Sequence, residues 1–183
     1  LSILRGKMKA LIIDGYVDEP ACFGVPPYIS PYIRYLAGAI REQGIHMQDI
    51  FYSAIDSIRF NPKVHEKIIR EADLVVIIAG MTVPGKYLRS TPVSLEELHV
   101  LSRTATGKVV LGGPIRLGFS SEGGKRASSL SGLENAYCCG ADVEAFVYDL
   151  LKDGKLEDPV NVNERFRFVQ EIGRWAKKGA FII

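Results

Sequence analysis

The stretch LVVIIAG, residues 74–80, decides the fold class, because five large apolar residues in a row precede Ala79 and Gly80. A run without polar alternation predicts a strand that is buried on both faces, as in a parallel sheet. A similar run, ALII at residues 10–13, is followed by Asp14 and Gly15. The run at 74–80 is the strongest strand signal in the chain and predicts a central strand.

Segments with helical spacing alternate with these strand-like runs. Two of them start with a capping residue before proline, at residues 30–31 and 61–62, and a third has the capping-box pair Ser94 and Glu97. We expect strands at 10–13, 45–52, 74–80, 108–113 and 134–140, and helices at 31–43, 62–72, 95–101 and 142–154. The alternation predicts an α/β fold, with a doubly wound, mainly parallel five-stranded sheet and helices on both faces.

The two ends of the chain differ from this pattern. Residues 1–7 precede Met8 and are interpreted as a tag or an upstream remnant, so the α/β domain is assigned to residues 8–156. Residues 157–183 are predicted to form one more helix, capped by Asn163, and the start of a further strand, AFII at 180–183. We expect this strand to lead into a part of a longer protein.

The composition excludes several classes of protein. The 183 residues carry a net charge of only +2, so no strong field attracts nucleic acid, and no apolar run is long enough for a membrane span. The three cysteines show no metal-binding spacing, and the adjacent pair Cys138 and Cys139 argues against a disulfide framework. We therefore expect a cytoplasmic protein in which Cys138 and Cys139 are small core residues of a buried strand.

Ligands of open parallel sheets bind beyond the carboxyl ends of the strands. Four of the five predicted strands have glycine at that end. These glycines either make room for a ligand or only allow the chain to turn, and the sequence leaves both interpretations open. The candidate cofactor-binding residues are Asp14, Gly15, Tyr16, Gly80, Met81, Thr82, Gly112, Gly113, Pro114, Gly140 and Asp142. No catalytic and no metal-binding residue is assigned.

Familiar nucleotide motifs are absent from these strand ends. No G-x-G-x-x-G follows the first strand, which argues against a dinucleotide site. The glycines before Lys125 have the wrong spacing for a phosphate-binding loop, and Arg126 stands in place of its serine or threonine. The third strand ends in Ala79 and Gly80 and so lacks the acidic acceptor of a receiver domain.

Three segments resemble the cobalamin-binding-like domain that precedes many radical S-adenosylmethionine enzymes. They are the helix motif around YLAGAIREQG at residues 35–44, ADLVVI at 72–77, and VVLGGP at 109–114. The resemblance covers nearly the whole chain and is closest to the leading portion of an uncharacterised archaeal group of radical S-adenosylmethionine (Fe–S oxidoreductase) proteins. It implies a flavodoxin-like fold, a cobalamin site at the carboxyl edge, and a following barrel that binds a [4Fe–4S] cluster and S-adenosylmethionine.

The chain departs from that family at two points. The cobalt-binding histidine of the D-x-H-x-x-G motif is missing after Asp14, and the three-cysteine cluster motif is absent. Without those thiolates the chain alone holds no iron–sulfur cluster, so we expect no radical chemistry from it.

Three hypotheses follow. In the favoured one the chain is a degenerate module that docks or positions substrate, through the segments 16–30, 81–92 and 115–132 and the helix with Phe166, Phe168 and Trp175. In the second it binds cobalamin without the histidine, with Thr82 as a hydrogen-bonding group. The third and remotest is a free-standing enzyme acting on a small molecule, with Asp14, Asp18 and Glu19 as carboxylates and Cys22 as nucleophile.

Overall fold

The computed structural model describes residues 8–15, 31–80, 92–117, 133, 135–140, 142–153 and 169–180. Its centre is a five-stranded sheet in the order β2-β1-β3-β4-β5, and every neighbouring pair is parallel. The strands are β1 (Ala10–Asp14), β2 (Ile50–Ala54), β3 (Leu74–Ile78), β4 (Lys108–Gly112) and β5 (Ala136–Cys138). This is the strand order of flavodoxin-like doubly wound folds, and it confirms the predicted fold class.

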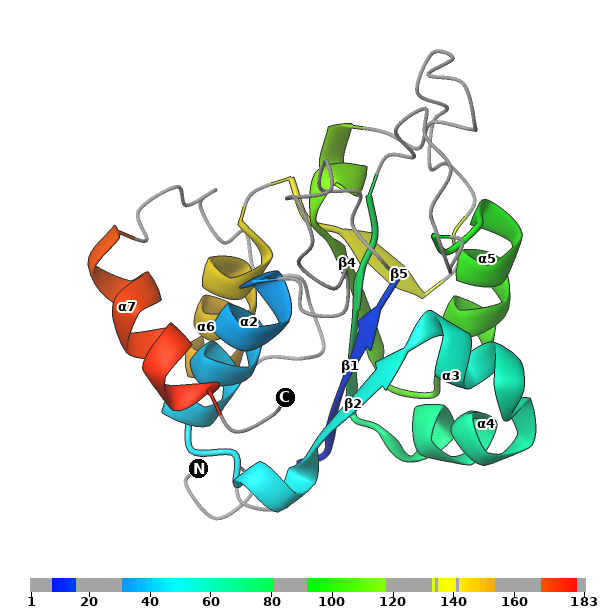
Figure 1. The fold of residues 1–183 in the computed structure, drawn as a ribbon, viewed down its shortest axis with the longest axis horizontal. Coiled ribbons are helices and arrows are strands. Elements are labelled where there is room, and N and C mark those ends of the chain that lie inside the picture. Colours follow the sequence, from blue (N-terminus) through cyan, green and yellow to red (C-terminus); the bar gives the residue numbers. More distant parts are fainter. Residues whose placement is uncertain are drawn as a thin grey trace, which may run out of the picture.

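Helices cover both faces of the sheet (Figure 1). One face carries α2 (Pro31–Glu42) and α6 (Val143–Asp153), with α7 (Val169–Lys178) packed against α2. The other face carries α3 (Ile55–Phe60), α4 (Pro62–Glu71) and α5 (Leu95–Thr104). Two short 3-10 helices, η1 (Met47–Asp49) and η2 (Pro114–Leu117), complete the described elements.

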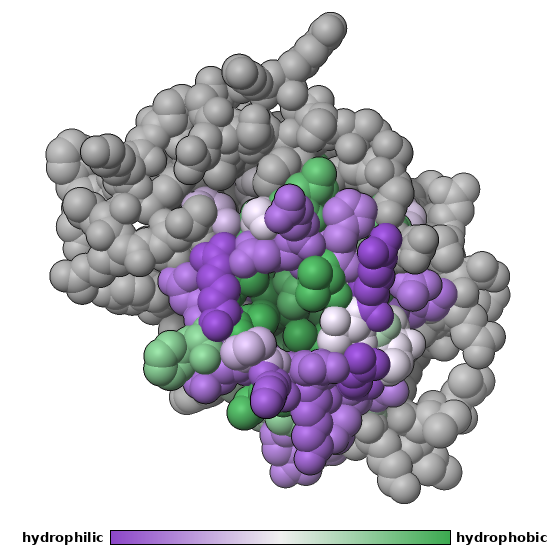
Figure 2. All heavy atoms as spheres, turned by 90° about the vertical axis from the view of Figure 1, so that its right-hand side faces the viewer, coloured by the Kyte–Doolittle hydropathy of each residue, from purple (hydrophilic) through white to green (hydrophobic). Residues whose placement is uncertain are grey.

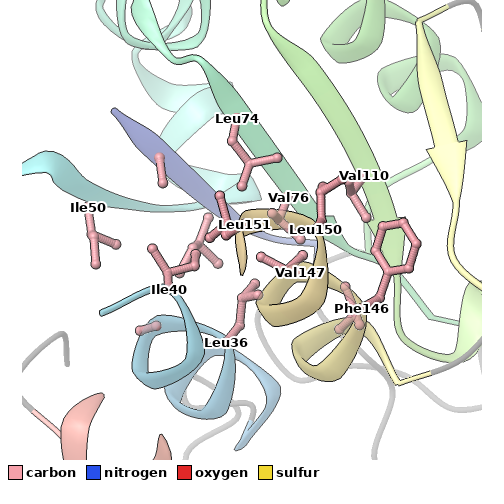
Figure 3. Close-up of a cluster of buried hydrophobic side chains, with 14 of the residues drawn as sticks. Leu36, Ile40, Ile50, Leu74, Val76, Val110, Phe146, Val147, Leu150 and Leu151 are labelled. Atoms are coloured by element: carbon pink, nitrogen blue, oxygen red, sulfur yellow. The ribbon is translucent and has the colours of Figure 1, made fainter. Parts of the chain in front are cut away.

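Successive side chains of each strand point to opposite faces of the sheet and form two separate hydrophobic cores. Ile12 and Val76, which are neighbours in register, pack with α2 and α6, and Figure 3 shows Val76 facing Leu36 of α2 and Val147 of α6. Leu11 and its partners point the other way, toward α4 and α5. All five residues of both β1 and β3 are buried, as expected of strands covered by helices on two faces.

Several local predictions need correction. The second strand begins at Ile50 rather than at residue 45, because residues 47–49 form the 3-10 helix η1. The helix α3 was not predicted, since only six residues separate β2 from the capping residue of α4. Cys138 is exposed, whereas Cys139 is buried as expected. The reason is that β5 lies at the edge of the sheet and is paired only with β4.

The C-terminal predictions are partly outside the described residues. The described part of the last helix is Val169–Lys178, and its predicted cap Asn163 falls outside the described residues. Of the strand predicted at 180–183, Ala180 lies in a turn and the other three residues fall outside. Within the described ranges, no helix combines the length and the apolar character needed to cross a membrane.

Candidate functional site

The carboxyl edge of the sheet brings several candidate residues into one rim. The order of the strands makes β1 and β3 neighbours, and their connections leave in opposite directions, which defines the switch point where ligands bind in open parallel sheets. Gly15 directly follows β1, Gly80 lies two residues after the end of β3, Gly112 ends β4, and Gly113 follows it. Tyr16, Met81 and Thr82 lie outside the described residues, as do Asp18, Glu19 and Cys22 of the enzyme hypothesis.

Backbone groups of this rim bond to one another beyond the ends of the strands. The Gly15 amide donates to the Ile78 carbonyl over 2.8 Å, and the Ala79 amide donates to the Gly112 carbonyl over 2.9 Å. The Ala79 carbonyl in turn accepts from the Ile115 amide at 3.0 Å. These amides are satisfied by the protein itself, so they are not donors for a ligand.

Gly15 is a packing glycine. A Cβ built on it would lie 2.5 Å from Cγ1 of Val93 and 2.6 Å from the Ile78 carbonyl oxygen. The Val93 amide also donates to the Gly15 carbonyl over 2.9 Å, and Val93 is only 2% exposed. The space that the missing side chain leaves is therefore filled by Val93.

The glycines of β4 have two different roles. A Cβ on Gly112 would overlap Cβ and Cγ2 of Val143, the first residue of α6, so this glycine lets α6 approach the sheet. Gly113 has a φ of +90°, a conformation that L side chains rarely adopt, and it turns the chain into η2 at Pro114. At β4 the glycine pair thus serves helix packing and a turn.

Three of the described rim residues carry carboxyl groups. Asp14 is fully buried at the end of β1, and its Oδ2 lies 3.5 Å from the Tyr52 hydroxyl. Asp142 precedes α6 and accepts the Phe146 amide through its carbonyl at 2.9 Å, while Glu144 in the first turn is 2% exposed. Acidic residues are favoured at this position, at the positive end of the α6 dipole. Gly140, just before this helix, is exposed.

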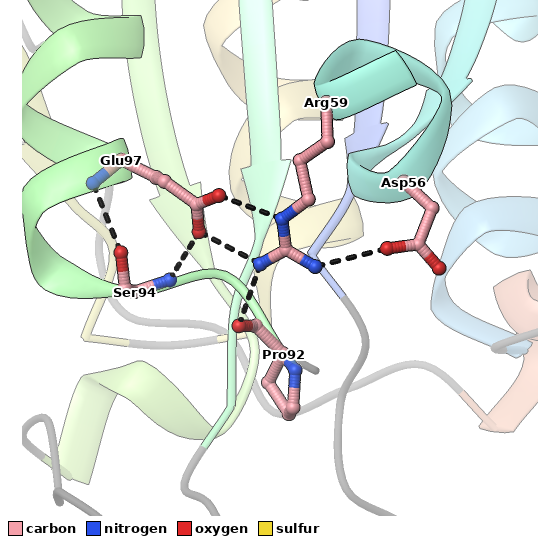
Figure 4. Close-up of polar contacts among 5 residues, drawn as sticks. All are labelled: Asp56, Arg59, Pro92, Ser94 and Glu97. Carbon is pink, nitrogen blue, oxygen red and sulfur yellow. Dashed lines mark hydrogen bonds and ion pairs between the residues drawn. The ribbon is translucent and has the colours of Figure 1, made fainter. Parts of the chain in front are cut away.

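Arg59 fixes the segment that carries Val93. Figure 4 shows its guanidinium against the Glu97 carboxylate, with atom pairs at 2.7 and 2.8 Å, and against the Pro92 carbonyl at 3.1 Å. Its third contact is Asp56 Oδ1 at 2.9 Å. The hydrogen bond from Arg59 lowers the pKa of Glu97 against the opposing effect of burial. Sequence reasoning missed Arg59, because its partner Glu97 is 38 residues away and no local pattern links them.

Glu97 also forms the predicted capping box of α5. Its backbone amide donates to Ser94 Oγ at 3.2 Å, and its carboxylate accepts from the Ser94 amide at 2.8 Å. One carboxylate thus joins the start of α5 to α3 beside the rim.

A serine–histidine contact lies near the carboxyl end of β2. Ser53 Oγ is 3.0 Å from His65 Nδ1 and links β2 to α4. Ser53 is only 4% exposed, which keeps its hydroxyl from an incoming substrate. Among the described residues no group of three histidine, cysteine or acidic side chains is arranged to hold a metal ion.

Two findings bear on docking. Trp175, which was expected to take part in docking with its helix, is instead fully buried against α2 and α6 of this chain. Figure 2 shows, on the side of the molecule formed by α3, α4 and α5, apolar atoms surrounded by hydrophilic ones. Three apolar side chains of these helices are more than half exposed: Phe60, Val64 and Val100.

Fold and rim together define a parallel α/β domain of the flavodoxin-like type. No protein-family model and no solved structure matches the chain. An uncharacterized protein of Archaeoglobus fulgidus is 45% identical over 115 residues, which are 63% of this chain and 21% of that protein. An uncharacterized protein of Methanocaldococcus jannaschii is 35% identical over 181 residues, 96% of this chain and 32% of that protein. The chain thus spans between a fifth and a third of these archaeal relatives.

Proposed function

We propose that the chain is an accessory N-terminal domain of a radical S-adenosylmethionine protein and is not catalytic by itself. In this proposal it is a degenerate cobalamin-binding-like module that docks on the following barrel or positions the substrate there. The motifs at 35–44, 72–77 and 109–114 support this proposal, as do the strand order and the much greater length of both relatives.

One observation carries the degenerate character of the module. Val93 and Val143 occupy the spaces that the rim glycines Gly15 and Gly112 leave open. A corrin is wide and flat and needs an open platform, and the cobalt-binding histidine is also missing. The space beside Gly15 and Gly112 is therefore not available to a corrin, and we assign no chemical step to cobalamin. The [4Fe–4S] cluster and S-adenosylmethionine are proposed for the barrel, whose cysteine thiolates would hold the iron.

Partners and location follow from the same proposal. The partner is the barrel of the same polypeptide, with a small molecule as the other candidate ligand, and the net charge of +2 favours neither nucleic acid nor a membrane surface. The cytoplasm is the proposed compartment, because a [4Fe–4S] cluster needs reduced thiolates and neither Cys138 nor Cys139 is part of a disulfide.

Two experiments test the two halves of the proposal. Hydroxocobalamin is mixed with the chain, the sample is desalted, and the visible spectrum is recorded. We expect no retained corrin absorbance, both for the parent chain and for a control with the exposed Val100 changed to alanine. Stoichiometric retention would establish the alternative, a cobalamin site without histidine. The natural reading frame after Ile183 is expected to encode C-x-x-x-C-x-x-C, and its absence would remove the radical S-adenosylmethionine assignment.

A further inference from the structure

The helix α7 lies against α2 at backbone contact (Figure 1). A Cβ on Gly38 of α2 would overlap the Trp175 carbonyl and lie 2.6 Å from Trp175 Cα. A Cβ on Gly179, directly after α7, would overlap the Arg34 carbonyl and lie 3.0 Å from the Gly38 amide nitrogen. The two glycines thus allow an approach that side chains would prevent.

Two arginines of α2 bind the carboxyl end of α7. Arg34 Nε donates to the Ala176 carbonyl over 2.7 Å, and an Arg41 guanidinium nitrogen donates to the Lys178 carbonyl. The last carbonyls of a helix have no partner within the helix, and this end carries the negative pole of the dipole. Arg34 and Arg41 therefore fix both the position and the direction of the last turn of α7.

An acidic residue completes the contact. Glu42, the last residue of α2, accepts from Arg174 Nε at 2.7 Å and lies 3.5 Å from Lys178 Nζ. Burial raises the pKa of Glu42, but the hydrogen bond from Arg174 and the charge of Lys178 outweigh it, and the pKa is lowered.

Trp175 anchors α7 to a second helix. It packs with Ala39 of α2 and Ala145 of α6, and its ring centroid lies 5.4 Å from that of Tyr148. The helix is therefore held by α2 and α6, which both lie on the sheet.

We propose that the contact between α2 and α7 is a rigid joint, which fixes the direction in which the backbone leaves α7 at Gly179 and Ala180. Because α2 starts at the carboxyl edge and packs on the sheet, Gly179 and Ala180 are held in one orientation to the rim. The biological use of the joint rests on the proposed function, in which the domain positions a following part. The rigidity of the joint is a property of this chain alone.

Distances between two spin labels test the joint. Ala180→Cys and Lys67→Cys place the labels at the exit and on α4, across the sheet, in a chain with Cys22→Ser and Cys138→Ser; Cys139 is buried. We expect one narrow distance distribution by pulsed electron resonance. A broad distribution in this parent chain would overturn the proposal.

Variants then identify the contact that holds the exit. Gly38→Val is expected to broaden the distribution at least twofold, because its side chain would overlap Trp175. If Gly38→Val does not fold by circular dichroism, Arg34→Ala with Arg41→Ala gives the same test without altering the glycine contact. Gly173→Ala is the matched control on α7, where nothing lies within 4 Å of a Cβ, and it should change nothing. If Gly38→Val or the double arginine variant folds and its distance distribution is unchanged, the contact between α2 and α7 does not hold the exit. The cobalamin experiment tests the proposed function separately, so its result does not depend on this outcome.

Discussion

The packing role of Gly112 leads to a quantitative prediction for a double-mutant cycle with Val143. Gly112→Ala places a methyl group onto Cβ and Cγ2 of Val143, and overpacking of this kind costs about 1–3 kcal/mol. Val143→Ala removes two buried methyl groups, which at about 0.8 kcal/mol for each carbon costs about 1.6 kcal/mol. In the double variant the smaller side chain at position 143 relieves part of the overlap, so the combined cost should fall below the sum by roughly 1 kcal/mol.

The assay is urea unfolding of the parent and the three variants, followed by far-ultraviolet circular dichroism. A matched control cycle pairs Gly112→Ala with Val100→Ala, whose side chain is exposed on α5, and this cycle should be additive. Additivity in the Val143 cycle would refute the reasoning, because it would mean that the methyl group introduced at position 112 finds open space.

Three further predictions concern other parts of the chain. Trp175→Ala should cost about 3–5 kcal/mol in thermal or urea unfolding, because the indole is fully buried. Arg59 lowers the pKa of Glu97 in the folded state, so this pair stabilises the fold above the ordinary carboxyl pKa of 4.5 and less as the pH falls below it. Arg59→Gln should remove roughly 1 kcal/mol or less at pH 7 and flatten this pH dependence. In a chain with Cys22→Ser, Cys138 should react with a thiol reagent in the native state and Cys139 only after unfolding.

Each of these predictions has a contradicting outcome. A red-shifted native Trp175 emission that acrylamide quenches readily would place the only tryptophan in water. If the free energy of unfolding of Arg59→Gln falls as steeply below pH 4.5 as that of the parent, the guanidinium of Arg59 is not what lowers the pKa of Glu97. Partial desolvation raises the pKa of the exposed Cys138 thiol, so it should react more slowly than a free thiol at pH 7. Equal reaction rates of Cys138 and Cys139 in the native state would contradict the burial of Cys139.

The fold was accessible from the sequence because its signals are local. The apolar runs at 10–13 and 74–80 have no polar face, which suffices to predict strands covered on two sides. Ser94 and Glu97, which lie within four residues, predict the start of α5, and both hydrogen bonds of the capping box are present. The edge position of β5, which exposes Cys138, depends on the order of the strands and has no local signal.

The sequence predicts which strand ends form the rim, but not which side chains fill the space beside its glycines. The sequence placed Gly15, Gly80, Gly112 and Gly113 at the ends of neighbouring strands, as the structure does, yet a glycine in a sequence does not reveal what fills the space beside it. Val93 reaches Gly15 from 78 positions away, and Val143 reaches Gly112 from the helix after the next strand. Likewise, the contact of Gly38 with Trp175 joins segments more than 130 residues apart, as does the bond of Arg34 to Ala176.

The most direct test of the closed rim is a nuclear magnetic resonance titration of the isotopically labelled chain with hydroxocobalamin. The amide resonances of Gly15, Gly80, Gly112 and Gly113 report on the carboxyl edge. The reference is the amide of Gly44, which follows the end of α2, a helix that starts at the carboxyl edge and leads away from it. A rim filled by Val93 and Val143 predicts that the four resonances stay in place as the corrin is added. Saturable shifts of these glycines, with Gly44 unmoved, would show that the edge is an open binding site.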